Sequence, residues 1–143
     1  MTSHIIRQHV GKYARKRPDL SPGNTVRVHE RVQEGDKERT QIFEGLIIGM
    51  HKGHVPTDRS FTVRKVVSGV GVEKVFPLHS PMLQNVQVTK EANVRRAKLN
   101  FLRGRSGRSA NLTERFTKNE DFAQAVAVPV QELTTGSDAA ESE

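Results

Sequence analysis

Val26-Arg-Val-His-Glu-Arg-Val-Gln33 and Glu38-Arg-Thr-Gln-Ile-Phe-Glu-Gly-Leu-Ile-Ile-Gly-Met-His-Lys52 decide the fold of this chain. In the first stretch, valines alternate with polar and basic residues, a period of two that is typical of a half-buried strand with basic side chains facing outward. The second stretch predicts a long strand that bends or bulges at Gly45 and Gly49. Residues 34–37, Glu-Gly-Asp-Lys, predict the hairpin loop between the two.

Further strands follow at short intervals. Residues 61–67 and 72–78 alternate in the same way, and a last strand runs through Val86 and Val88. Five short strands separated by turns predict a mainly β chain, folded as a small antiparallel barrel or sandwich. Closure of the barrel would remove its exposed edges.

The barrel, residues 20–93, is expected to carry three appendages. Residues 1–19 predict a basic amphipathic helix over 4–16 that ends before Pro18. Residues 94–116 form a basic extension, in which the spacing of apolar residues over 94–103 predicts a short helix packed on the barrel. Residues 117–143 form an acidic tail, which we expect to be partly disordered because its end is low-complexity sequence.

Composition excludes several classes of protein. Of 143 residues, 34% are hydrophobic and none is cysteine, so the core is small and disulfides, thiolate zinc sites and iron–sulfur clusters are excluded. The longest apolar run, residues 46–50, is too short for a membrane span, and the N-terminus lacks the pattern of a secretory signal. We therefore expect a soluble, cytoplasmic protein.

The net charge of +7 conceals an asymmetry. Residues 117–143 contain one lysine and six acidic residues, a charge of −5, which leaves +12 on residues 1–116. Proteins that neutralise nucleic-acid phosphates need many lysines and arginines, so the basic body predicts binding to a polyanion. Arginine predominates after residue 94, and its planar fork suits phosphate. Because Trp is absent and Tyr13 is the single tyrosine, we expect recognition of backbone shape and charge in folded RNA rather than base stacking.

No pattern of catalysis or cofactor binding stands out. Gly69-Val-Gly71 lacks the third glycine of a dinucleotide fingerprint, and no phosphate-binding loop ends in Gly-Lys-Ser or Gly-Lys-Thr. His51 and His54 have no cysteine to complete a zinc site and are interpreted as loop residues near phosphate. Ser80, His79 and Glu73 could supply a nucleophile, base and acid, but no strained serine elbow supports a hydrolase. We expect no enzyme, no metal and no cofactor.

Specific motifs then appear in order along the chain. They are Pro22-Gly-Asn-Thr-Val-Arg-Val-His29, Glu34-Gly35, Glu38-Arg39 with Gln41-Ile-Phe-Glu-Gly45, Phe61-Thr-Val-Arg-Lys65, Gly69-Val-Gly-Val-Glu73, Phe76-Pro-Leu-His-Ser-Pro81 and Val94-Arg-Arg-Ala-Lys-Leu99. Over roughly residues 3–116, this series resembles the bacterial large-subunit ribosomal protein nineteen family.

The resemblance implies an SH3-like barrel bound to 23S rRNA at the subunit interface, contributing to an intersubunit bridge with 16S rRNA. It also implies neighbouring large-subunit proteins of the fourteen and three families. The residues that it implies for RNA binding are Arg64, Lys65, His79, Arg95, Arg96 and Lys98. The charge pattern adds Arg7, Lys12, Arg15, Lys16, Arg27, His29, Arg39, His51, Lys52, Arg103, Arg105 and Arg108.

Three departures from the family pattern limit the transfer. Asn24 replaces an expected acidic residue, Glu91-Ala-Asn93 replaces a basic turn, and the acidic tail has no counterpart. The alternative function is a free SH3-like transcription or nucleoid factor that acts on DNA.

Overall fold

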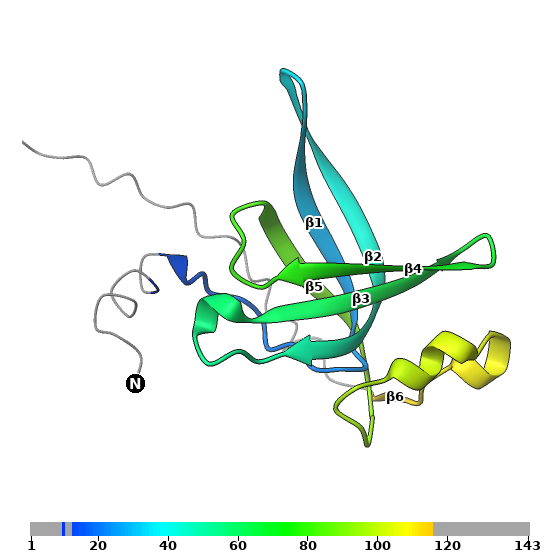
Figure 1. Ribbon diagram of the computed structural model, residues 1–143. Coiled ribbons are helices and arrows are strands. Elements are labelled where there is room, and N and C mark those ends of the chain that lie inside the picture. The colour runs from blue at the N-terminus through cyan, green and yellow to red at the C-terminus, as the bar shows by residue number, and fades with distance from the viewer. Residues whose placement is uncertain (1–9, 11–12, 116–143) are drawn as a thin grey trace, which may run out of the picture.

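The structure is a computed structural model that describes residue 10 and residues 13–115 (Figure 1). Most of the predicted helix over 4–16 and the whole tail 117–143 lie outside these residues. The described part of that helix contains one helical hydrogen bond, in which the Ala14 amide donates to the Val10 carbonyl at 2.9 Å. Among the described residues, no helix is long and apolar enough to cross a membrane.

Six antiparallel strands form the sheet, in the order β4-β3-β2-β1-β5-β6. The five predicted strands are confirmed, and the short sixth was not predicted. Their bounds are β1 Thr25–Glu34, β2 Lys37–His51, β3 Ser60–Val67, β4 Val70–Pro77, β5 Leu83–Ala92 and β6 Glu114–Arg115. A 3-10 turn, η1 (Pro56–Asp58), lies between β2 and β3. The β1–β2 hairpin stands out from the rest of the molecule (Figure 1).

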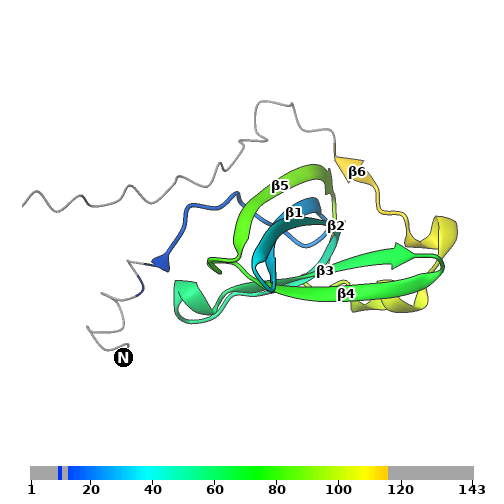
Figure 2. The same cartoon turned by 90° about the horizontal axis from the view of Figure 1, so that it is seen from above.

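The sheet curls into a half barrel, with the strands following an arc from β5 through β1 and β2 to β3 and β4 (Figure 2). Full closure, which the sequence analysis expected, does not occur, because β4 and β5 are not neighbours in the described sheet. The connection between them covers the open side instead. Leu78 and Leu83, at the two ends of this connection, are both buried in the core.

The main core lies inside the curl and consists of the inward-facing residues that the period-two pattern predicts. Val26 and Val28 of β1 are fully buried there beside Phe61 and Val63 of β3, and Phe76 of β4 completes the centre. Phe76 packs against Phe61 with ring centroids 5.6 Å apart. The apolar residues that recur at every second position of each strand are therefore the ones that face the core, and the residues between them face outward.

β2 supplies side chains to two cores because adjacent residues of a strand face opposite sides of the sheet. The pairing of β2 with β3 is irregular between Ile47 and Gly49, which confirms the bulge predicted near Gly49. Ile47 points into the main core, whereas Ile48 joins a second buried cluster with Leu99 and Leu102. The second cluster attaches the C-terminal segment to the outer face of the sheet.

This C-terminal segment, residues 94–110, is called the extension below. The single helix predicted over 94–103 is wrong. Residues 94–99 are irregular, and two 3-10 turns follow, η2 (Asn100–Gly104) and η3 (Gly107–Ala110). The Leu99 amide donates to the Ile48 carbonyl at 2.6 Å, and Lys98 forms an isolated bridge with Gly49. These contacts with β2 replace the helical hydrogen bonds that the spacing of apolar residues predicted.

Candidate nucleic-acid interface

Several of the predicted RNA ligands on the sheet have acidic partners. Arg27 lies opposite Glu44 in the β1–β2 register and forms an ion pair with it at 3.0 Å. At the hairpin end, Arg39 pairs with Glu34 at 2.7 Å. Pairs of opposite charge that face one another across strands add modest stability and leave little net charge for phosphate.

Glu73 joins the sheet to the extension. Its carboxylate on β4 accepts hydrogen bonds from Arg64 of β3 at 2.9 Å and from Arg103 of η2 at 2.8 Å. Arg64 also donates to the Arg103 carbonyl at 3.4 Å. The hydrogen bond from Arg103 lowers the pKa of Glu73, burial opposes this shift, and Arg64 lowers the pKa further. Arg64 and Arg103 were predicted to bind RNA, but in the structure both of them pair with the Glu73 carboxylate.

The segment that enters the sheet is held by Arg17. Its guanidinium donates to the backbone carbonyls of Leu78 at 3.1 Å and Leu83 at 2.7 Å, with longer contacts to Ser80 and Gln84. Burial lowers the pKa of Arg17, and the nearby Arg15 lowers it further. Arg17 therefore orders the β4–β5 connection.

His79 belongs to the same contact. Its Nδ1 accepts the Arg15 backbone amide at 3.0 Å, so this nitrogen carries no proton. Burial lowers the pKa of His79, with further lowering from Arg17 and a smaller raising effect of the Arg15 hydrogen bond. His79, predicted as an RNA ligand, is thus half-buried and neutral at physiological pH.

The serine, histidine and acid considered for a hydrolase are not brought together. The Ser80 hydroxyl accepts the Met82 amide at 3.2 Å, His79 bonds to Arg15, and Glu73 bonds to two arginines. Within the described residues, no group of three or more potential metal ligands occurs. His51 and His54 are exposed at and after the end of β2.

Most basic side chains of the extension have no acidic partner among the described residues. Arg95, Arg96, Lys98, Arg105 and Arg108 are all exposed, and within residues 13–115 none of them forms an ion pair. Two of these guanidiniums stack on the Phe101 ring, Arg105 at 4.8 Å and Arg96 at 5.4 Å from its centroid. Stacking holds their planes in place without removing their charge.

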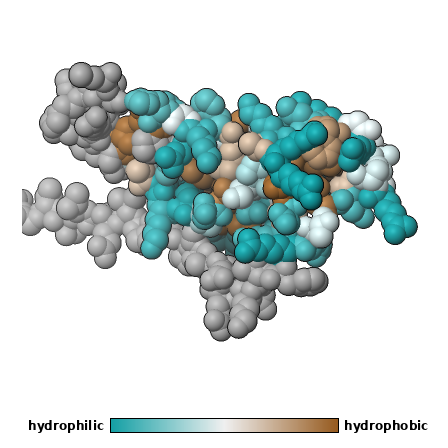
Figure 3. Space-filling view, turned by 90° about the horizontal axis from the view of Figure 1, so that it is seen from below, coloured by the Kyte–Doolittle hydropathy of each residue, from teal (hydrophilic) through white to brown (hydrophobic). Residues whose placement is uncertain are grey.

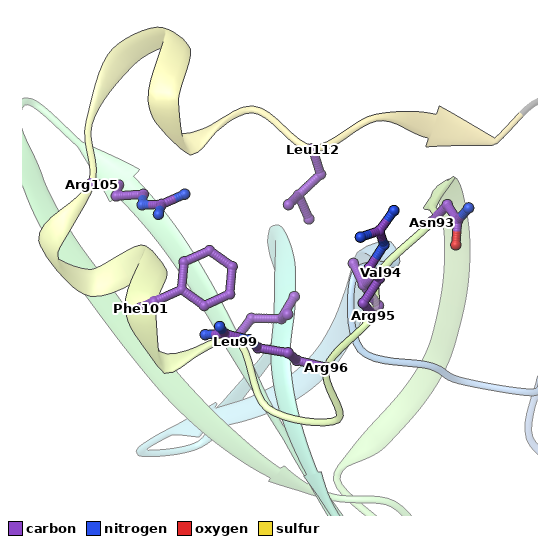
Figure 4. Close-up of a pocket in the computed structure, with 8 residues that line it drawn as sticks. All are labelled: Asn93, Val94, Arg95, Arg96, Leu99, Phe101, Arg105 and Leu112. Carbon is purple, nitrogen blue, oxygen red and sulfur yellow. The ribbon is translucent and has the colours of Figure 1, made fainter.

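A hollow of about 280 Å³ opens between these side chains and is called the arginine pocket below. Its lining consists of Asn93, Val94, Arg95, Arg96, Leu99, Phe101, Arg105 and Leu112. Figure 4 shows the guanidiniums of Arg105 and Arg95 on opposite sides of the opening, with the Phe101 ring and Leu112 between them. The floor is apolar and the rim is cationic.

The remaining predicted ligands fall into four groups. Arg15 is half-buried, and its backbone amide bonds to His79. Lys16, Lys52 and Lys65 are exposed, as an RNA contact requires. His29 is half-buried, and its buried Nε2 has no hydrogen-bond partner, so it is not presented to a ligand. Arg7 and Lys12 lie outside the described residues. Seen from below, hydrophilic side chains cover most of the surface, and apolar ones show in separate spots (Figure 3).

Sequence reasoning missed three residues that organise the interface: Arg17, Glu73 and Phe101. Arg17 lies in the basic segment 1–19 but was not among the predicted ligands, Glu73 was considered for catalysis, and no role was predicted for Phe101. Phe101 had one available signal, since it stands among arginines in Arg95–Arg108, where cation–π contacts are favoured.

Comparison with known proteins identifies the family. The family model of ribosomal protein L19 matches residues 4–115. A similar curated protein is the large ribosomal subunit protein bL19 of Anaeromyxobacter sp. (strain Fw109-5), 50% identical over 102 residues, which cover 71% of this chain and 75% of the relative. The matched region contains the curled sheet, the Glu73 contacts and the arginine pocket. The chain belongs to the ribosomal protein L19 family.

Proposed function

We propose that the chain is a structural constituent of the cytoplasmic large ribosomal subunit. In this proposal it binds 23S rRNA at the subunit interface and contributes to a bridge with 16S rRNA. The observation that carries it is the unneutralised, arginine-rich extension mounted on a sheet whose other arginines are largely paired with acids. Family membership supports the same conclusion.

The distribution of unpaired charge indicates which parts of the chain contact RNA. The half barrel, residues 20–93, is a platform, and the extension together with the basic segment 1–19 contacts RNA. Arg95, Arg96, Lys98, Arg105 and Arg108 are the primary phosphate ligands, while Arg27, Arg39 and Arg64 contribute less because their charge is shared with glutamates.

Protein neighbours would use a different surface. The end of the β3–β4 hairpin exposes the apolar side chains of Val66, Val67, Val70 and Val72, between 42% and 65% accessible. Valines do not suit phosphate, whereas apolar clusters suit protein contacts. We assign this surface to neighbouring large-subunit proteins, with the fourteen and three families as candidates.

The test is sedimentation of the endogenous protein. It should migrate with the large subunit through a sucrose gradient at ordinary magnesium concentration, and its absence from that fraction would overturn the proposal. A salt titration separates the rival nucleoid or transcription factor. That factor would bind duplex DNA regardless of sequence with a slope of about −0.9 per phosphate contact, whereas a ribosomal protein would prefer a folded rRNA fragment.

A further inference from the structure

The arginine pocket combines two properties that rarely occur together on an exposed surface. Its rim carries the guanidiniums of Arg95, Arg96 and Arg105, none of them in an ion pair within the described residues. Its floor is formed by Leu99, Phe101 and Leu112, which belong to the second apolar cluster. An occupant that satisfies both needs carboxylates or phosphates next to apolar groups.

The described part of the chain ends close to this pocket, at Arg115. β6 pairs with the end of β5, and the Asn93 amide donates to the Thr113 carbonyl at 3.0 Å. Asn93 and Leu112 both line the pocket. The last described residue, Arg115, is therefore three residues from the lining residue Leu112, and Thr113 between them contacts the lining residue Asn93.

The sequence that follows has the required chemistry. Glu120 and Asp121 directly precede Phe122, and residues 117–143 carry a charge of −5. An extended chain spans at most about 3.3–3.6 Å per residue, so the five residues from Arg115 to Glu120 reach up to about 17 Å. This length is enough to turn back onto the rim and place an aromatic side chain over the apolar floor.

We propose that the acidic tail of this chain, through Glu120, Asp121 and Phe122, docks in the arginine pocket of the same molecule. Tethering gives the tail an effective concentration in the millimolar range, so even a weak site is occupied in the free protein. The docked tail covers the strongest cationic surface. The consequence for RNA rests on the proposed function: rRNA, with many phosphates, displaces the tail, whereas short or non-specific polyanions compete poorly.

Charge and shape favour the tail over an RNA base as occupant of this pocket. The floor is aliphatic apart from Phe101, and two guanidiniums already occupy positions over that ring. A phosphate backbone would leave the apolar floor uncovered. A segment with two carboxylates followed by an aromatic residue contacts both rim and floor.

The absence of cysteine allows a direct test in the full chain. A nitroxide attached to Ala125→Cys should broaden the NMR signals of Phe101 and Leu112 at ~20 mM salt and lose this effect at ~500 mM, because salt screens charge pairs. Glu120→Gln with Asp121→Asn should reduce the broadening at least twofold. The matched control, Glu141→Gln with Glu143→Gln, removes the same charge and should leave it unchanged.

The pocket side is tested in the same way. Arg95→Gln with Arg105→Gln should abolish the broadening, and Lys52→Gln with Lys65→Gln should not. Barrel amide signals report whether each variant is folded. Absence of broadening at low salt, or an equal response to both acidic pairs, would overturn the docking. Broadening that persists when a folded rRNA fragment binds would overturn the displacement by RNA. The gradient experiment is independent of these signals, so failure of docking and failure of the ribosomal assignment are distinguishable.

Discussion

Glu73 and Arg103 meet through two hydrogen bonds, from Nε and from Nη2 of the arginine, each 2.8 Å long. They connect the edge strand β4 with η2, residues far apart in the sequence. Together with the buried cluster around Leu99, they fix the extension on the outer face of the sheet. The position of the exposed arginines of the extension is thus set partly by an acidic residue.

Replacement of Glu73 should loosen the extension while the sheet stays folded. We expect Glu73→Gln to lower the free energy of unfolding by about 1 kcal/mol or less, because the partners are partly exposed. Hydrogen exchange of the Leu102 and Arg105 amides should accelerate more than exchange in β1. Equal acceleration in both places would contradict a local role.

The same contact should respond to acid. Since Arg103 lowers the pKa of Glu73 in the folded chain, the contact stabilises the fold at pH values above the ordinary glutamate pKa of about 4.3. That stabilisation is lost as the pH falls below 4.3 through the folded value. Denaturation between pH 6 and 3 should show the loss, and Glu73→Gln should show a smaller one.

Leu99→Ala should undock the extension. Leu99 is 1% exposed beside Ile48 and Leu102, and removal of a buried leucine side chain costs about 2–5 kcal/mol. We expect the lower end of that range in urea denaturation, because the cluster lies at the surface of the sheet. Val66→Ala, at a site that is 61% exposed, is the control and should cost less than about 0.5 kcal/mol.

Arg95→Ala with Arg96→Ala should weaken binding to rRNA and incorporation into the large subunit without a large drop in melting temperature. Each lost phosphate contact removes about 0.9 from the slope of log K against log salt, so the slope should become shallower by about 1.8. Arg27→Ala with Arg39→Ala, which removes the same formal charge from residues paired with glutamates, should change the slope less. A large fall in melting temperature would mean that Arg95 and Arg96 are structural.

His79 should make the β4–β5 connection sensitive to pH. Burial lowers its pKa in the folded chain, so the unfolded chain takes up a proton first as the pH falls below about 6.5. Stability therefore declines from pH 6.5 downward until the folded value is reached. A His79→Gln variant should lose this dependence in thermal melts between pH 7.5 and 5.

Deletion of residues 117–143 should leave rRNA binding intact or severalfold tighter. The deletion removes a charge of −5 from the molecule, and the proposed docking predicts a freed arginine pocket. Filter binding with a folded rRNA fragment measures the effect. A clear loss of affinity would show that the tail itself contacts RNA.

Alternating apolar residues were sufficient to predict the strands, because one face of each strand is buried and period two follows from that burial. The bulge near Gly49 was predictable because a glycine within a strand often marks a bulge. The prediction of a helix over 94–103 was wrong. The spacing of apolar residues fits a helix, but the Leu99 amide bonds to the Ile48 carbonyl, and this partner is distant in the sequence.

The sequence was enough to predict which basic residues could form the candidate site, but not which of them pair with acidic residues. The sequence contains the arginines, but the strand register decides which of them faces a glutamate. Arg27 and Glu44 are separated by 17 positions and become neighbours through the β1–β2 pairing. Arg17 was unpredictable for the same reason, because its partners are backbone carbonyls of a connection more than 60 residues away.

The placement of Ile47 and Ile48 in two different cores also sets an order of events during synthesis. The extension rests on a bulge that exists only after β2 has paired with β3, and it emerges from the ribosome after β5. Residues 94–110 therefore acquire their shape on a sheet in which β1 to β5 are already available, and β6, which follows them in the chain, joins β5 afterwards. A nascent or misfolded chain would carry the same arginines without the pocket, so recognition that depends on the pocket would select chains that have finished folding.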